Sequence, residues 1–169
     1  MKHRTNTWKK SLMMLGLCAV LGVTGCGDKE VKEAYETAVT ALEEGDYETA
    51  AQEFQIVADT GKKLPEAYRG LGIAQLNLGK YAEASIALSK SLLYLEDNNA
   101  EFERDVKSYL AISRTRRSEY DEAIKLYDEL IQMDGCYEYY FFRGKWAVSN
   151  EMYHNKTTGF RSYFLTFAD

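Results

Sequence analysis

The apolar positions of the chain follow the spacing of amphipathic helices. One such set falls at i, i+3, i+4 and i+7, on one face of a helix: Ala123, Leu126, Tyr127 and Leu130. A second stripe with this spacing lies near the C-terminal end of the sequence: Phe160, Tyr163, Phe164 and Phe167. The chain has one proline, Pro65, which suits long helices because proline disrupts helix interiors. The pattern predicts an all-α fold.

The helical pattern also repeats along the chain. Three segments align, at residues 43–54 (EEGDYETAAQEF), 77–88 (NLGKYAEASIAL) and 116–127 (RRSEYDEAIKLY). With Tyr47 at position i, Tyr81 lies at i+34 and Tyr120 at i+73, and the longer second interval contains a polar stretch between helices. A weaker fourth unit has Tyr153 at the corresponding place. A helix pair of this length cannot bury its own apolar face, so the pairs are expected to stack into a solenoid.

These units resemble the tetratricopeptide repeat. The second unit matches that motif best, at Tyr68, Leu71, Gly72, Gly79, Tyr81, Ala84 and Leu88. The resemblance covers about residues 31–169, with the first helix expected to begin near Val31. It implies antiparallel helix pairs stacked in a right-handed superhelix of about three and a half repeats, at about 31–64, 65–100, 104–136 and 137–169.

Small residues recur where two helices of the repeat are expected to touch. These packing positions are Ala38, Ala50, Gly72, Ala84, Ala111, Ala123 and Gly144. Gly45 and Gly79 are expected to end helices or form tight turns, because glycine adopts positive φ without a penalty. The last unit departs from the repeat, and its second helix is expected to begin near Thr157 or Thr158, either of which can N-cap it. Its aromatic end packs back onto the preceding helices, is covered by a partner, or continues in a longer array.

The resemblance implies that the first helices of the units line a concave groove that holds an extended peptide. The groove-facing candidates are Tyr35, Val39, Arg69, Ile73, Asn77, Tyr109, Ile112, Arg116, Phe141 and Lys145. Val39, Ile73 and Ile112 equally fit a structural role in the core. Some members clamp a terminal carboxylate with Lys, Asn and Arg, but the corresponding positions here hold Tyr35, Val39, Gly70, Asp105 and Tyr109. Recognition of chaperone tails is therefore not expected.

The N-terminal segment has the organisation of a secretory signal. A basic stretch, residues 1–10, precedes an apolar run at residues 11–23, which is short for a membrane-spanning helix. Residues 23–26 (VTGC) resemble a bacterial lipobox, which implies cleavage after residue 25 and a covalent lipid on Cys26. Residues 26–30 would then be a short tether, and the body would lie at the extracytoplasmic face of a bacterial membrane. The alternative is an uncleaved anchor.

Charge argues against nucleic acid as a partner. Residues 1–25 contain four Lys or Arg and no acid, so the other 17 basic and 26 acidic side chains leave the rest of the chain with a net charge of −9. A phosphate backbone is bound mainly through Lys and Arg, and this body is acidic.

The sequence shows no catalytic constellation. Outside the N-terminal segment it has one thiol, Cys136, and one histidine, His154, which are expected in the turns at the two ends of one helix. We therefore expect no enzymatic activity, no metal site and no cofactor other than the lipid on Cys26. The predicted function is a membrane-anchored adaptor for protein–protein interaction. The alternative is an accessory protein that captures peptide or glycan ligands.

Overall fold

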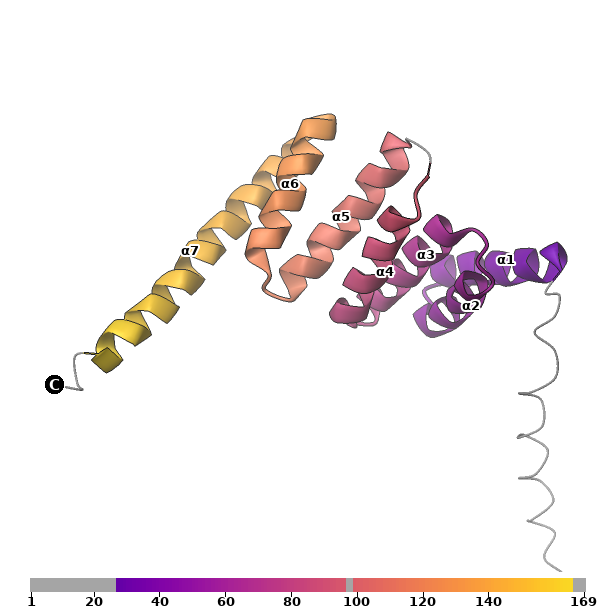
Figure 1. Cartoon of the computed structure of the whole chain (residues 1–169), viewed down its shortest axis with the longest axis horizontal. Coiled ribbons are helices and arrows are strands. Elements are labelled where there is room, and N and C mark those ends of the chain that lie inside the picture. The colour runs from indigo at the N-terminus through magenta and orange to yellow at the C-terminus, as the bar shows by residue number, and fades with distance from the viewer. Residues whose placement is uncertain (1–26, 97–98, 166–169) are drawn as a thin grey trace, which may run out of the picture.

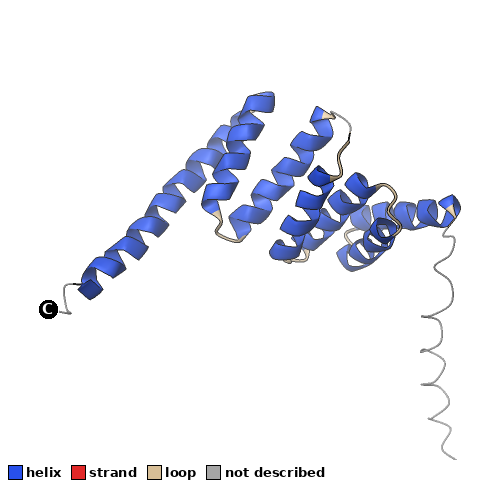
Figure 2. Cartoon of the chain, viewed as in Figure 1, coloured by secondary structure: helices blue, strands red, loops and turns tan. Residues whose placement is uncertain are grey.

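The computed structural model describes the backbone of residues 27–96 and 99–165 and the side chains of residues 27–96 and 99–151. Seven helices lie in these ranges: α1 (Asp28–Glu44), α2 (Tyr47–Asp59), α3 (Leu64–Asn77), α4 (Tyr81–Leu93), α5 (Ala100–Arg116), α6 (Tyr120–Asp134) and α7 (Tyr137–Leu165). The described residues form no strand (Figure 2). None of these helices combines the length and the apolar character that a membrane span requires.

Each helix packs against its neighbours in the sequence, so the helices form a single array from α1 to α7 (Figure 1). Helix α3 also contacts both α1 and α5 along the array, because each of the three is the first helix of a pair. The predicted all-α fold of stacked helix pairs is confirmed.

The turns within the first three pairs each have a residue with positive φ at the same place before the second helix. Gly45 and Gly79 adopt φ values of 81° and 74°, as predicted, and each lies two residues before the tyrosine that opens the next helix. The third pair has Ser118 at this position with a φ of 61°. A left-handed conformation strains a residue with a β-carbon, so this serine sits where glycine fits better.

Close packing within each pair rests on a large side chain placed against a small residue. A β-carbon on Gly72 would lie 2.6 Å from Leu88 Cγ, so only glycine allows α3 and α4 to approach this closely. In the first pair Ala38 and Phe54 belong to one buried cluster, and in the third pair Ala111 and Tyr127 do. The alanines predicted at packing positions are all fully buried: Ala38, Ala50, Ala84, Ala111 and Ala123.

A polar contact joins the second and third pairs inside the core. The hydroxyls of Ser85 on α4 and Ser113 on α5 are 2.8 Å apart, and both side chains are buried. The Ser113 hydroxyl also donates to the carbonyl oxygen of Tyr81, at 2.7 Å. Since Ser113 uses its proton in that bond, Ser85 donates to Ser113, and both buried hydroxyls are satisfied.

Three expectations about helix positions were wrong. Helix α1 begins at Asp28, earlier than expected, and Asp28 and Glu30 lie in its first turn, where acidic side chains interact favourably with the helix dipole. Helix α7 is continuous, so the fourth unit is not a helix pair. Threonine and glycine each cost a helix interior only about 1 kcal/mol or less, and this segment has no proline. Gly144 is exposed and is no packing contact, because among the described residues no helix follows α7 to pack against this face.

Candidate functional site

A cleft of about 380 Å³ lies where α1, α3 and α5 come together. We call it the helix cleft. Its lining comes from all three helices and the residue that caps α5: Tyr35, Glu66, Arg69, Asn99, Glu101, Phe102 and Asp105. These residues are distant in the sequence, and the stacking of the first helices brings them together. The lining combines two aromatic rings with charged groups of both signs.

Arg69 is the central cation of the helix cleft, and it is already paired. Its Nε donates to Asp105 Oδ2 at 2.5 Å, which links α3 to α5. The guanidinium carbon lies 6.0 Å from the ring centre of Phe102 and 5.9 Å from that of Tyr109. Asp105 and the two rings thus hold Arg69 in one orientation, so a ligand anion must compete with Asp105 for it.

Tyr35 forms the α1 wall of the helix cleft. Its ring meets Phe54 edge-on, with the centroids 5.9 Å apart, and Lys63 Nζ lies 4.8 Å from the ring centroid. Burial raises the pKa of the Tyr35 phenol, the carboxylate of Glu66 raises it further, and Arg69 opposes this. The phenol therefore stays neutral at physiological pH and can both donate and accept a hydrogen bond.

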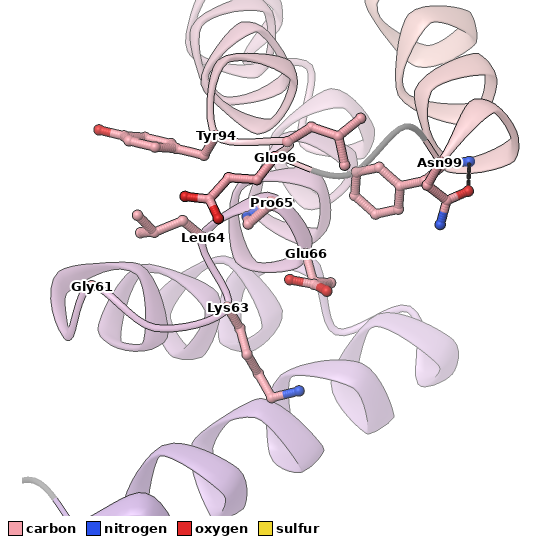
Figure 3. A pocket seen from close by; sticks show the side chains of 10 residues that line it. Gly61, Lys63, Leu64, Pro65, Glu66, Tyr94, Glu96 and Asn99 are labelled. Carbon is pink, nitrogen blue, oxygen red and sulfur yellow. Dashed lines mark hydrogen bonds between the residues drawn. The ribbon is translucent and has the colours of Figure 1, made fainter.

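A second cleft of about 330 Å³, which we call the loop cleft, adjoins the helix cleft and shares Glu66, Asn99 and Phe102 with it. It lies between the loop that leads into α3 and the segment that leads into α5 (Figure 3). Its further lining residues are Gly61, Lys63, Leu64, Pro65, Tyr94, Leu95 and Glu96. The Asn99 side chain accepts a hydrogen bond from the Phe102 backbone N–H at 3.1 Å and so caps α5. The two clefts form one continuous candidate site.

The predicted groove residues are divided between this site and other places. Tyr35 and Arg69 line the helix cleft, and Tyr109 stands beside it through its contact with Arg69. Ile73 is only 7% exposed and belongs to the core, which was the alternative interpretation, and Val39 packs against the first-pair core. The other candidates on α3 and α5 lie outside the clefts: Asn77, Ile112 and Arg116 are exposed, and the Asn77 amide donates to the Ile73 carbonyl.

Phe141 and Lys145 do not join the clefts either. Both lie exposed on α7, at the far end of the array, and Lys145 Nζ lies 4.9 Å from the Trp146 ring centroid. The exposed face of α7 that carries Phe141 is therefore a surface separate from the two clefts.

Sequence reasoning missed five of the residues that line the helix cleft: Glu66, Asn99, Glu101, Phe102 and Asp105. The signal was present on α5, because Phe102 and Asp105 precede Tyr109 by seven and four positions and so share its helix face. Extending the set of groove candidates from Tyr109 toward the N-terminus of this helix would have found both. Glu66 lies one turn before Arg69 on α3 and follows from the same rule.

A larger hollow of about 570 Å³ lies along α2 and α3 and contains none of the predicted groove residues. The Gln75 side-chain oxygen in its lining is buried and has no hydrogen-bond partner among the described residues. The hollow is lined by residues of α2 and α3 together with Leu78 and Lys80, and none of its lining residues is aromatic. We therefore take the paired clefts as the candidate site.

Two predicted chemical features lie wholly or partly outside the described residues. Cys26 falls outside them, as does the side chain of His154, whereas Cys136 is a free, half-buried thiol between α6 and α7. In the part of the chain that the structure describes, no three His, Cys, Asp or Glu side chains are placed to hold a metal ion.

Comparison with known families matches residues 35–100 to the family model described as a tetratricopeptide repeat. The match runs from Tyr35 in α1 to Ala100, the first residue of α5, and so covers most of the first two helix pairs and much of the two clefts. A comparison with curated proteins finds no match. The matched segment and the stacked pairs together support a protein that contains tetratricopeptide repeats.

Proposed function

We propose that this chain is a non-catalytic adaptor that binds an extended segment of a partner protein in the helix cleft and the loop cleft. The observation that carries the proposal is the convergence of α1, α3 and α5 on one cleft within a tetratricopeptide-repeat segment, a class of repeat that suggests an interaction scaffold. Partly exposed aromatic rings beside fixed charges can bind a peptide through packing and a few directed contacts.

The charges of the two clefts favour a basic segment over an acidic one. Four carboxylates line them and only two cations do, and Asp105 already pairs with Arg69. The carboxylates are Glu66, Glu96, Glu101 and Asp105. A lysine or arginine of the partner can lie between these groups and the rings of Tyr35 and Phe102, which attract cations through their faces.

Charge reversal tests this site. We expect Glu66→Lys together with Glu101→Lys to abolish recovery of the partner when intact cells are crosslinked and the full chain is isolated from their membranes. The matched control is Glu83→Lys with Glu122→Lys, because these four exposed glutamates all lie in the first turn of a helix. A lysine at any of these positions interacts equally unfavourably with the helix dipole. The proposal fails if both double variants recover the same partners as the wild type.

We further propose that the adaptor is held at the extracytoplasmic face of a bacterial membrane by a lipid on Cys26. The basic flank, the apolar run and the VTGC sequence support this anchor. Helix α1 begins only two positions after Cys26, which leaves a tether of about 7 Å at most. The clefts would therefore work close to the headgroups.

Substitution of the cysteine tests the anchor separately from the clefts. We expect Cys26→Ala to accumulate as an unprocessed precursor that incorporates no radiolabelled fatty acid, with Cys18→Ala as the control that is processed normally. If Cys26→Ala is processed and retained on membranes as the wild type is, the lipid anchor is refuted and the binding proposal is unaffected.

A further inference from the structure

Three helix pairs share a contact that α7 lacks. In each pair the small residue stands at position i of the first helix, and the large side chain that packs on it stands at i+16 in the second. The pairs are Ala38 with Phe54, Gly72 with Leu88, and Ala111 with Tyr127. The corresponding small residue of α7 is Gly144. Apart from Gly144 itself and the neighbouring residues of α7, no described atom lies within 4 Å of the place that its β-carbon would take. Helix α7 therefore has the small residue of this contact, but no large side chain packs on it among the described residues.

Gly144 lies in the middle of an exposed apolar stripe. Tyr137, Phe141, Gly144 and Val148 follow one another at i, i+4, i+7 and i+11 and so share one face of α7. Tyr137 is 79% exposed, Phe141 55% and Val148 58%. The opposite face of α7 is occupied, because Phe142 stacks on Tyr127 and Trp146 stacks on Tyr120, both of α6. The stripe therefore faces away from the array.

We infer that this stripe binds the same stripe of a second copy of the chain, with the two α7 helices antiparallel. The four positions are symmetric about a point midway between Phe141 and Gly144. A twofold axis at this point sets Phe141 of each copy on Gly144 of the other and Tyr137 against Val148. A twofold contact is self-complementary in this way, and here it repeats the large-on-small packing that joins α3 to α4.

The charges beside the stripe support the same orientation. Glu138 and Lys145 directly follow Tyr137 and Gly144, so they lie along one edge of the stripe. Both are exposed, and neither takes part in an ion pair among the described residues. In an antiparallel pair of helices the same edges meet, which places Glu138 of each copy beside Lys145 of the other and gives two complementary pairs. A parallel arrangement loses these pairs and sets Gly144 against Gly144, which leaves a gap.

The size of the stripe indicates a weak dimer. An aromatic side chain buries about 150–250 Å² when it is fully covered, so the two exposed rings and the valine of each copy stay below the about 1,200 Å² of stable complexes. The dimer is therefore expected to form at high local concentration, and it uses a surface separate from the two clefts.

Sedimentation velocity of the full chain, with detergent present and protein from micromolar to hundreds of micromolar, tests the dimer. We expect a concentration-dependent monomer–dimer equilibrium. Gly144→Leu should raise the dissociation constant at least about tenfold, because the leucine occupies the space into which Phe141 of the other copy packs. This loss is expected even though leucine makes the surface more apolar. Circular dichroism should show unchanged helix content in this variant, because position 144 has free space in the monomer.

Charge exchange tests the antiparallel register. Glu138→Lys or Lys145→Glu alone sets like charges against each other twice, and we expect each to raise the dissociation constant about tenfold. The double exchange, Glu138→Lys with Lys145→Glu, should restore the wild-type value. The inference is overturned if the wild type stays monomeric throughout, if Gly144→Leu dimerises as well as or better than the wild type, or if the double exchange does not restore association.

Discussion

The ring of Phe54 on α2 occupies the space that a β-carbon on Gly70 of α3 would need. Both residues are buried, and Phe54 is among the largest fully buried side chains in the described part of the chain. The first and second helix pairs therefore meet at a point where only glycine fits. Gly70 also lies next to Arg69 in the sequence, so this contact helps to position α3 for the helix cleft.

Replacing Gly70 by alanine is expected to destabilise the protein, because the added methyl overlaps the Phe54 ring and the two helices must move apart. Overpacking of this kind costs about 1–3 kcal/mol in the free energy of unfolding. Gly144→Ala is the matched control, since it adds the same methyl to a helix where it meets nothing, and alanine should stabilise that helix by up to about 1 kcal/mol. Urea unfolding followed by circular dichroism measures both. Equal effects of the two changes would show that Phe54 does not press on Gly70.

Ser118→Gly is expected to stabilise the protein. Ser118 has a φ of 61° where the first two pairs have glycine, and glycine relieves about 1 kcal/mol of left-handed strain. The reverse change, Gly79→Ser, should destabilise by a similar amount, because Gly79 has a φ of 74° at the same place in the second pair. Thermal unfolding of the two variants checks the opposite signs. A loss of stability in Ser118→Gly would mean that the serine side chain contributes more than its backbone strain costs.

The Ser85–Ser113 contact predicts non-additive mutations. Ser113→Ala removes the acceptor of the Ser85 hydroxyl and the donor to the Tyr81 carbonyl, and an unsatisfied buried polar group costs about 1–3 kcal/mol. The double change, Ser85→Ala with Ser113→Ala, should cost less than the sum of the two single changes, since no hydroxyl is then left without a partner. A double-mutant cycle by urea unfolding measures the difference. Strict additivity would contradict the buried hydrogen bond.

Lys107 predicts a dependence of stability on alkaline pH. Its ammonium lies 2.6 Å from Glu103 and 2.9 Å from Glu129, which joins α5 to α6. Burial, the largest single influence, lowers its pKa, but hydrogen bonds and charge from the two glutamates together outweigh it, and the pKa is raised above 10.5. A raised pKa in the folded state means that the stabilisation is complete below pH 10.5 and is lost as the pH rises through the folded-state value.

Lys107→Met isolates this contribution. We expect it to lower the free energy of unfolding by about 1 kcal/mol at neutral pH, the typical size of a partly buried hydrogen-bonded ion pair after solvent screening. The difference between the wild type and Lys107→Met should shrink above pH 10.5. Comparing the two proteins at each pH removes the effect of Tyr127, whose pKa burial raises and whose unfolded form ionises in the same range. A difference that stays constant up to about pH 12 would contradict the pairing.

Much of the fold could be read from local patterns, and the exceptions have physical causes. The alanines at packing positions and the glycines of the first two turns follow from size and backbone conformation, which each residue carries with it. Gly144 has the same local signature as Gly72, yet it is exposed, because a packing glycine needs a second helix to pack against it. The continuity of α7 could not be foreseen either, since threonine and glycine weaken a helix without ending it.

The candidate site was less predictable. Tyr35 and Arg69 were identified from the repeat, whereas Ile73, on the same helix as Arg69, turned out to be buried. Whether an apolar residue at a helix edge is covered depends on how closely the next pair approaches, which depends on side chains far away in the sequence. The lining of the helix cleft therefore became complete only when α1, α3 and α5 were placed side by side.

By itself, the sequence determined the helices of the first three pairs, their pairing and the small residues where they touch, because these depend on periodicity, propensity and side-chain size within a few turns. Tertiary structure decided what the pairs present to a partner. It joined Arg69 to Asp105 between two separate helix pairs, placed Glu66 and Phe102 in one cleft, and left the Tyr137–Val148 face of α7 uncovered. The reason is that surface chemistry in a helical array depends on which faces the neighbouring helices leave exposed, and no single helix carries that information.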